Sequence, residues 1–294
     1  MKCDLHVHSW YSGPCDTPFL NRFCRESYAD PEALREVLRS RGMNLVTVTD
    51  HDSIEGALAL RHHADCFLSE EVTCRMPSGT TVHVGVYDLS EHQHFHIQQR
   101  RNDLVALLMY LTERRIFFSI NHVFSSLTGR REREDFAWFA QYFPAIETRN
   151  GQMLAGQNMH AERLARLWRR AEVGGSDAHT HSSSGKTYTE VAGATSKEEF
   201  LGGLWAGRGR VAGEVGGYVK LTYELLLIAY EAMRENSWNA ILGPLALAIP
   251  VATLLNYARE VAFGYRWSGR ILGEQRERHR PFRIGAEQGL GEEA

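Results

Sequence analysis

Short apolar runs that end in histidine or acidic residues recur along the first two thirds of this chain. The polar ends are His6 and His8, Asp50-His51-Asp52, Glu70-Glu71, Asn121-His122 and Asp177-Ala178-His179, and His83 lies inside a further run, Thr81–Tyr87. Such ends are typical of a parallel α/β barrel, because the carboxyl ends of its strands converge on one site. Packing alone does not explain an ordered series of metal-ligand types. The pattern therefore predicts an α/β fold with a metal site at one end of its strands.

The first two histidines are one residue apart. Residues 2–5 are expected to form a short strand, and side chains alternate along a strand, so His6 and His8 should point to the same face. Neutral imidazole is a common ligand of zinc, iron and similar ions. Taken alone, this motif is equally compatible with two surface histidines.

Amphipathic segments alternate with the apolar runs, as an α/β fold requires. The sequence predicts helices over residues 31–41, 53–63, 91–114, 158–171 and 196–207. Asp30 and Pro31 supply the N-cap and the first residue of the first helix. Residues 125–134 are expected to form a loop over the site.

Six stretches resemble the motifs of the polymerase and histidinol phosphatase (PHP) superfamily, in the same order and with similar spacing. They are DLHVHS (4–9), TDHDSI (49–54), SEEVT (69–73), VHVGVY (82–87), NH (121–122) and GSDAH (175–179), and together they cover most of residues 1–200. The resemblance implies a distorted (β/α)7, TIM-like barrel with two or three divalent metal ions (Zn, Mn or Fe) at the strand ends. It also implies hydrolysis of phosphate esters.

The resemblance assigns a ligand set. It implies His6, His8 and Asp177 for the first metal, Glu71 as a bridge, His83 and His122 for the second metal, and His51 and His179 for the third. A bridging carboxylate would offset the repulsion between two cations about 3.5–4 Å apart.

The chain departs from the family pattern at one acidic ligand, which usually follows the second histidine by five residues. That position is Gly13. Asp16 is the expected substitute, because the Gly13-Pro14 turn can swing it inward, and Cys15 and Glu26 are weaker candidates. The third metal site is therefore the least well specified, and a two-metal centre stays open.

Further residues are candidates for catalysis and for substrate binding. The catalytic candidates are His51, Asp177 and His181, and the candidate phosphate contacts are Arg130, Arg131 and Lys186. Arginines at the mouth of a metal site can grip phosphate in a bidentate manner. A run of charges is more often simply solvated, so this assignment depends on where the loop lies.

After about residue 212 the chain becomes more apolar and helical. Residues 237–258 carry no charge and are long enough to cross a bilayer, which takes about 20 residues. A helical hairpin that packs on the barrel or on a second copy is the alternative. We therefore predict a hydrolase domain (1–212), an apolar helical extension (213–275) and a charged, disordered tail (276–294). Membrane association or self-association through residues 221–263 stays open, as does the entry of residues 237–258 into a membrane.

Charge and cysteine content restrict the function further. The formal net charge of −3 gives no strong attraction to long nucleic acids. The five cysteines form no CxxC pair, which favours a reducing, cytoplasmic location.

The predicted function is hydrolysis of phosphate monoesters or nucleotide phosphates by a metal-activated water, on a small phosphorylated substrate or a short oligonucleotide. The alternative is a catalytically weakened metal-binding module with a regulatory or membrane-anchoring role. An amidohydrolase-like enzyme acting on C–N bonds ranks last, because these strand ends carry no lysine that could bridge two metals.

Overall fold

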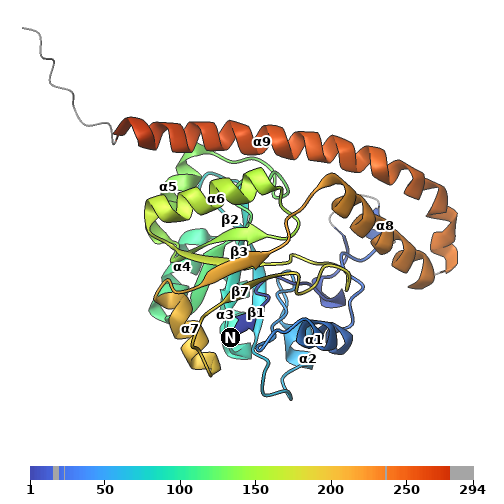
Figure 1. Cartoon of the computed structure of the whole chain (residues 1–294), viewed down its shortest axis with the longest axis horizontal. Coiled ribbons are helices and arrows are strands. Elements are labelled where there is room, and N and C mark those ends of the chain that lie inside the picture. Colours follow the sequence, from blue (N-terminus) through green and yellow to red (C-terminus); the bar gives the residue numbers. More distant parts are fainter. Residues whose placement is uncertain (16–19, 23, 236, 279–294) are drawn as a thin grey trace, which may run out of the picture.

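Two β-sheets, covered by helices, make up the body of the protein (Figure 1). The computed structural model describes residues 1–15, 20–22, 24–235 and 237–278. The larger sheet contains, in spatial order, β2 (Ser69–Arg75), β3 (Thr81–Tyr87), β4 (Phe117–Ile120), β5 (Ala145–Asn150) and β6 (Ala171–Gly175). The smaller sheet contains β1 (Lys2–Cys3), β7 (Thr187–Glu190) and β8 (Arg210–Gly213). The predicted mixed α/β class is confirmed.

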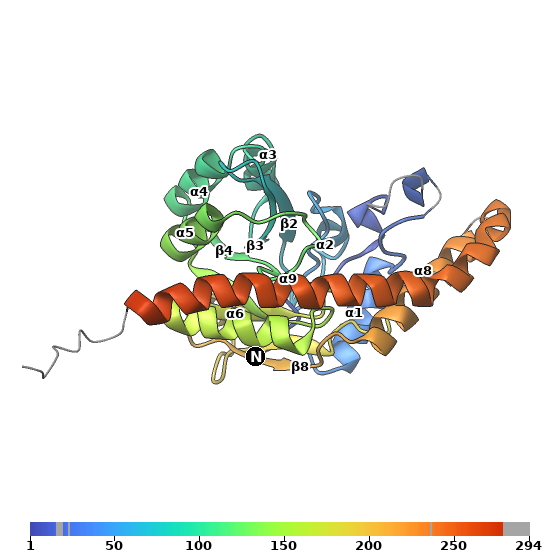
Figure 2. The ribbon, with the colours of Figure 1, turned by 90° about the horizontal axis from the view of Figure 1, so that it is seen from above.

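The helices surround these sheets, and the last helix crosses the molecule. The described α-helices are α1 (Pro31–Ser40), α2 (Glu55–Ala59), α3 (Glu91–Gln98), α4 (Leu104–Glu113), α5 (Arg133–Tyr142), α6 (Ala155–Trp168), α7 (Lys197–Trp205), α8 (Tyr218–Glu235) and α9 (Ile249–Arg278). Short 3₁₀ segments are η1 (Trp10–Ser12), η2 (Leu20–Arg22) and η3 (Ser237–Ala248). Figure 2 shows α9 running along α6 and then on toward α8.

One strand runs against the direction that the sequence predicted. Strands β4, β5 and β6 are parallel, but β3 is antiparallel to both β2 and β4. The turn between β2 and β3 is too short for a crossover helix, and Gly79 in it has a φ of +82°. Because Val84 pairs with Ile120, the beginning of β3 lies at the same edge as the end of β4. This reversal explains why His83 lies near the start of its strand.

The described sheets do not close into one barrel, so the predicted barrel is not confirmed. Single bridges do connect the two edges of the larger sheet. Val7 bridges to Ala178 beyond β6, the Thr49 amide donates to the Val7 carbonyl at 2.9 Å, and His51 bridges to Glu71 on β2. The segments around Val7 and Thr49 were predicted as strands, but they form isolated bridges instead of ladders.

Several helix and strand boundaries differ from the predictions. The single helix predicted over 91–114 is two helices, because the Asp103 side chain accepts a hydrogen bond from the Ala106 amide and starts α4 as a new N-cap. Helix α6 begins at Ala155, before the predicted residue 158. Strand β5 and helix α5 were not predicted at all.

The largest apolar core lies between the large sheet and α4, α5 and α6, and α9 contributes to it. Trp267 of α9 stacks on Phe136 of α5 with ring centroids 5.5 Å apart, and Ile271 of α9 is also buried. One face of α9 is thus part of the hydrophobic core.

The C-terminal region contains the apolar segment noted in the sequence. By length and composition alone, the helical segment Gly243–Gly273 could cross a membrane, and 11% of its most apolar window is buried. The predicted disordered tail comprises residues 276–294. Its first three residues belong to α9, and residues 279–294 lie outside the described residues.

Candidate metal centre

Glu71 of β2 lies in the middle of five imidazole rings. Its Oε2 is 3.1 Å from His6 Nε2, 3.3 Å from His51 Nδ1 and 3.5 Å from His8 Nε2, and its Oε1 is 3.2 Å from His122 Nε2 and 3.5 Å from His83 Nδ1. The register of the β2–β3 hairpin permits this, because Gly85 lies opposite Glu71 and brings no side chain. A single buried carboxylate therefore faces histidines from several separate chain segments.

Asp177 joins the two N-terminal histidines. Its Oδ1 lies 3.4 Å from both His6 Nε2 and His8 Nε2. The candidate ligand atoms of these three residues all lie within 4.8 Å of one another. This is the group that the resemblance implied for the first metal.

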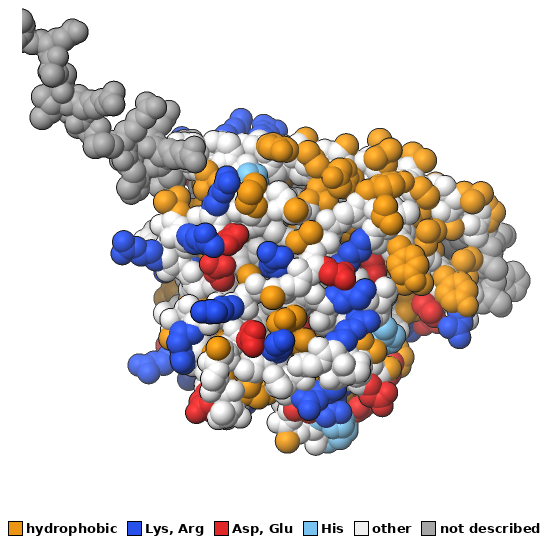
Figure 3. Space-filling model, viewed as in Figure 1, with side chains coloured by type: hydrophobic (Ala, Val, Ile, Leu, Met, Phe, Trp, Pro, Cys, Tyr) orange, Lys and Arg blue, Asp and Glu red, His pale blue; other side chains and the backbone are white. Residues whose placement is uncertain are grey.

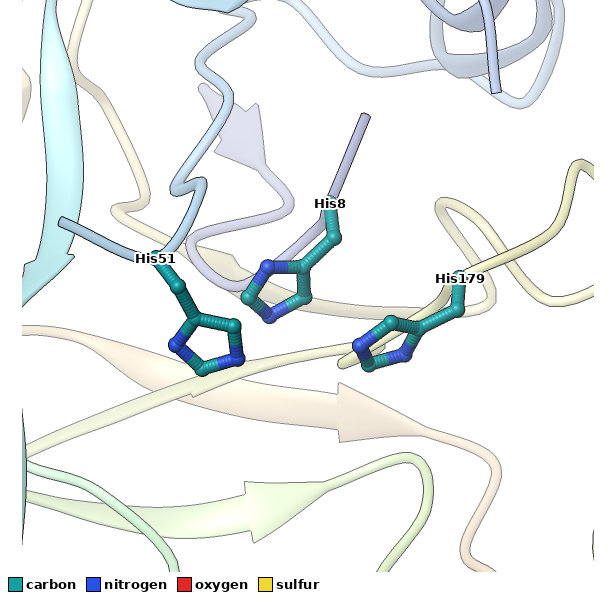
Figure 4. Close-up of side chains that lie close together, drawn as sticks. All are labelled: His8, His51 and His179. Atoms are coloured by element: carbon teal, nitrogen blue, oxygen red, sulfur yellow. The ribbon is translucent and has the colours of Figure 1, made fainter. Parts of the chain in front are cut away.

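His8, His51 and His179 form a further group, and their rings face one another in Figure 4. Glu26 completes this group, because its Oε1 lies 3.3 Å from His51 Nε2 and 3.5 Å from His179 Nε2. The Glu26 amide donates to the Gly13 carbonyl at 3.0 Å. Glu26 therefore stands beside the residue where the family's acid is missing.

This arrangement changes the interpretation of the third site. Asp16, the predicted acid, lies outside the described residues, and Glu26 was the weaker candidate. A bridge between Pro14 and Arg25 closes the intervening loop, so Glu26 returns next to Gly13. Distance along the sequence favoured Asp16, and only the loop closure reveals Glu26.

The donor set fits divalent cations. Around this centre, the buried ring nitrogens that face Glu71 or Glu26 and have no hydrogen-bond partner in the described part of the chain are His6 Nε2, His8 Nε2, His51 Nδ1, His83 Nδ1 and His179 Nε2. Glu71 Oε2 also has no hydrogen-bond partner there. Buried polar atoms are costly when they lack partners. Imidazole and carboxylate donors around a shared centre suit ions such as Zn, Mn or Fe.

Charge at the centre also suits cations. Burial alone would raise the pKa of Glu71, but His6, His83 and His51 outweigh it and hold the pKa well below its usual value. Burial and the neighbouring His179 lower the pKa of His8 to about 3. Burial would lower the pKa of His51, but Glu71 and Glu26 outweigh it and raise that pKa to about 10. Ionised carboxylates and neutral imidazoles are the forms that bind metal ions, so metal binding would displace a proton from this ring.

Residues behind the ligands orient them. Glu147 of β5 places Oε1 2.7 Å from His6 Nδ1, and its Oε2 accepts the His122 amide at 2.9 Å. Asn121 donates to Glu71 Oε1 at 2.8 Å, and Asn150 donates to Asp177 Oδ2 at 2.9 Å. Such partners fix the ring orientation of metal ligands. Glu147 was not among the predicted site residues, although it follows the short apolar run Ala145-Ile146.

Asp50 orients a candidate ligand and is not itself part of the candidate ligand groups. It accepts hydrogen bonds from the Ser9 amide at 2.6 Å and from Ser12 Oγ at 2.8 Å. Ser12 Oγ in turn lies 3.0 Å from His8 Nδ1. Asp50 therefore positions His8 through Ser12.

The backbone is strained at two candidate ligands. His122 has a φ of 29° and Asp177 a φ of 50°, both in the left-handed region that most residues avoid. Such strain costs about 1–3 kcal/mol per residue and clusters at functional sites. Hydrogen bonds from the His122 amide to Glu147 and from the Asp177 amide to the His6 carbonyl help to hold both conformations.

A cavity of about 570 Å³ opens over the centre. Its floor includes Glu26, His51, Glu71, His83, His122, Asp177 and His179. Arg25 is the only lysine or arginine among its described lining residues. Arg25 was not among the predicted site residues, and its only sequence signal is its position next to Glu26.

Four predicted residues do not line this cavity. Arg131 is buried and donates to the Thr81 carbonyl and to Thr128 Oγ1, so its role is to hold the loop. Arg130 is exposed, and Lys186 Nζ lies 3.8 Å from Glu214 Oε1. Neither residue lines the cavity. His181 is absent from the described lining of the cavity, and burial lowers the pKa of its imidazole. The predicted phosphate contacts and the predicted catalytic role of His181 are therefore not supported by position.

Parts of this chain are similar to known sequences. A family model described as PHP-associated matches residues 155–208. An uncharacterised protein of Methanocaldococcus jannaschii is 32% identical over 62 residues, which cover 20% of this chain and 33% of that protein. The chain thus matches about a third of the length of this curated relative.

Two solved structures have a similar fold. One is a two-domain protein containing a predicted PHP-like metal-dependent phosphoesterase from Bacteroides vulgatus, with a TM-score of 0.54 and 18% identity, covering 73% of this chain and 65% of that chain. The other is PsfC from Pseudomonas syringae, with a TM-score of 0.53 and 16% identity, covering 80% of this chain and 98% of that chain. At these identities the likeness concerns the fold alone.

Proposed function

Because this chain belongs to the PHP superfamily, we propose that it is a metal-dependent phosphoesterase that hydrolyses phosphate monoesters or nucleotide phosphates. The observation that carries the proposal is the convergence of five histidines on Glu71, at the floor of an open cavity. A buried carboxylate among unpartnered imidazole nitrogens suits a polynuclear cation site and has no evident structural purpose.

The residues that would hold the ions fall into overlapping groups. These are His6, His8 and Asp177; His6, Glu71 and His122; His51, Glu71 and His83; and His8, His51 and His179 with Glu26. Bound divalent ions would supply a more acidic water and would neutralise charge on the phosphate oxygens. Two or three ions are compatible with these groups.

The chain's own residues would orient and bind the substrate. Arg25 is the candidate phosphate contact, since it lines the cavity and a guanidinium has five donors, of which Nε binds Glu235 at 2.7 Å. His51 and Asp177 also line the cavity and can contact substrate, whereas His181 does not. Glu147 and Ser12 would keep the outer ring nitrogens of His6 and His8 engaged, so that the Nε2 atoms face the centre.

We also propose that the body is a distorted barrel that ends near residue 212. Support comes from the single bridges Val7–Ala178 and His51–Glu71, which connect the two edges of the larger sheet. In this interpretation the N-terminal strands are reduced to single bridges, and residues 213–275 form an extension that packs on the barrel.

Metal analysis and a phosphatase assay test the proposal together. Protein purified without chelator should contain divalent metal and should hydrolyse an aryl phosphate, and a chelator should abolish the activity until metal is returned. His8→Ala and Glu71→Gln should each lower the rate at least a hundredfold while circular dichroism and the melting temperature show a folded protein. His62→Ala, in an exposed group with Glu32, is the matched control and should keep full activity. Full activity of both centre variants would refute the proposal.

The second candidate is a weakened metal-binding module without turnover. Its main support was the missing acid at Gly13, and Glu26 now stands beside that position. Stoichiometric metal binding without hydrolysis of any ester, across a panel of aryl, alkyl, sugar and nucleotide phosphates, would favour this module over the enzyme.

For location, we propose a cytoplasmic protein that binds a membrane surface through α9. Figure 3 shows hydrophobic side chains gathered along α8 and α9. Val251, Leu254, Leu255 and Tyr265 of α9 are each more than half exposed. Their spacing places them on one face, and Arg259, Arg266 and Arg270 lie along its edge. The opposite face of α9 is buried at Glu260 and Trp267. This burial favours a helix that lies on the bilayer surface over one that crosses the bilayer.

A further inference from the structure

The wall of the cavity above the metal centre is apolar. Leu225, Ile228 and Ala229 of α8 and Ile249 and Ala252 of α9 line it, together with Leu127 of the loop that follows His122. Residues 225, 228 and 229 have the spacing of one helix face, as have 249 and 252. Two successive C-terminal helices therefore turn apolar faces toward the same space that the metal ligands line from below.

Buried carboxylates fasten this apolar wall to the loops that carry the ligands. Glu224, next to Leu225, accepts a hydrogen bond from Ser183 Oγ at 2.7 Å and another from Thr180 Oγ1, just beyond His179. Glu260 of α9 accepts the Ser126 amide at 3.0 Å, beyond His122. Both carboxylates are 5% exposed. The wall is thus a built part of the site.

The cavity offers little to a highly charged or sugar-rich substrate. Arg25 is the one cationic side chain in the described lining, and apolar residues occupy most of the positions away from the ligands. Nucleotides and sugar phosphates carry polar groups that would lose water against this wall without gaining hydrogen bonds, which costs binding energy. An apolar group would gain by leaving water at the same place.

We propose that the substrate is an amphiphilic phosphate monoester, whose phosphate lies at the metal centre and whose alkyl or aryl group packs against α8 and α9. The inference rests on the proposed phosphoesterase function and specifies its substrate class. A volume of about 570 Å³ accommodates a phosphate together with a medium-sized apolar group, since pockets for small ligands measure roughly 300–1,000 Å³.

A series of n-alkyl phosphates, used below their critical micelle concentrations, tests the inference. From ethyl to octyl phosphate, kcat/KM should rise by about fourfold for each methylene that reaches the wall, until the cavity is filled. Glycerol phosphate and adenosine monophosphate should be poorer substrates than hexyl phosphate. A flat series, or a preference for the two polar esters, would overturn the substrate class while leaving the phosphoesterase function intact.

Neighbouring leucines on α8 give a matched pair of variants. Leu225 lines the cavity and is 44% exposed, whereas Leu226 is 39% exposed and is absent from the described lining. Leu225→Gln should lower kcat/KM for octyl phosphate at least fivefold, and should leave ethyl phosphate within twofold. Leu226→Gln should change neither. Equal losses in both variants, or an equal loss on both esters, would contradict the proposed subsite.

Binding of n-alkylphosphonates, measured by calorimetry on the metal-loaded protein, separates the two proposals. Affinity that increases with chain length and falls in Leu225→Gln supports the apolar subsite, even if no ester is hydrolysed. In that case the phosphoesterase function fails and the subsite stands. Affinity that is independent of chain length refutes the subsite, whatever the activity.

Discussion

Glu260, on the last helix, accepts hydrogen bonds from the backbone amide of Ser126 at 3.0 Å and from its hydroxyl, four residues after the candidate ligand His122. Gln157 of α6 donates to the same carboxylate at 2.6 Å. A carboxylate 134 residues away along the chain thus stabilises the loop that begins at the metal centre. The C-terminal extension is therefore coupled to the site, in addition to any role at a membrane.

Glu260→Gln should destabilise the protein and loosen the loop after His122. Hydrogen bonds to a charged group contribute about 1.5–3 kcal/mol each, and the amide can replace only part of them, so we expect a loss of about 1–3 kcal/mol in the free energy of unfolding. Urea denaturation measures the loss. Glu231→Gln on α8, a half-exposed partner of Arg234, is the control and should lose less than about 0.5 kcal/mol. Equal stabilities of wild type and Glu260→Gln would contradict the anchoring role.

Glu26 and Asp16 give opposite predictions for the third site. If Glu26 completes the group with His51 and His179, Glu26→Gln should lower the metal content by about one ion per chain, because the imidazoles lose their anionic partner. Asp16→Asn should keep the wild-type content. Metal analysis after equilibration with a fixed free concentration of Zn²⁺ or Mn²⁺ decides between them. Loss of the ion in Asp16→Asn alone would return the assignment to Asp16.

The sequence could indicate most of the ligands because each follows or lies in its own apolar run. His6, His8, His51 and Glu71 are local features of this kind, and the structure brings them together as the pattern suggested. Glu26 and Glu147 could not be found in this way. Glu26 depends on the closure of a loop, and Glu147 depends on a strand whose apolar part is only two residues long.

Long-range packing limited the rest of the prediction. No sequence feature near Leu225 or Glu260 indicates that α8 and α9 lie above the strand ends. That placement depends on hydrogen-bond partners far away in the sequence, such as Ser126 and Ser183. The reversal of β3 was in principle visible, since Pro77-Ser78-Gly79 is a turn signal between two strand-like runs. The polar strand ends favoured a parallel barrel instead, in which β2 and β3 would run in the same direction.

An ion pair away from the centre gives a prediction on pH dependence. Arg35 Nη2 lies 2.9 Å and 3.0 Å from the two carboxylate oxygens of Asp65. Burial raises the pKa of Asp65, but the hydrogen bonds of Arg35 outweigh it and hold the pKa below its usual value. The pair therefore stabilises the fold above the pKa of the unfolded carboxyl, and this contribution is lost as pH falls through the lowered pKa.

Asp65→Asn should accordingly lower the free energy of unfolding by about 1 kcal/mol at pH 7, and the difference from wild type should shrink as the pH approaches 3. Chemical denaturation at several pH values measures this. Glu113→Gln, on the exposed face of α4, should show no such convergence. A difference that stays constant with pH would mean that packing, and not charge, accounts for the effect of Asp65→Asn.

Binding of α9 to a membrane surface can be tested with vesicles that contain anionic lipid. Leu254 and Leu255 are 54% and 68% exposed on the outward face, and burying a leucine contributes about 1.5–3 kcal/mol. The double variant Leu254→Gln/Leu255→Gln should therefore lower vesicle partitioning about tenfold or more in co-sedimentation. The control is Val105→Gln/Met109→Gln on α4, which removes two apolar side chains that are 38% and 68% exposed and should bind as wild type does. Raising the salt concentration should weaken binding through Arg259, Arg266 and Arg270. If wild type stays in solution with vesicles and sediments as a dimer without them, the apolar face of α9 instead joins two copies of the chain.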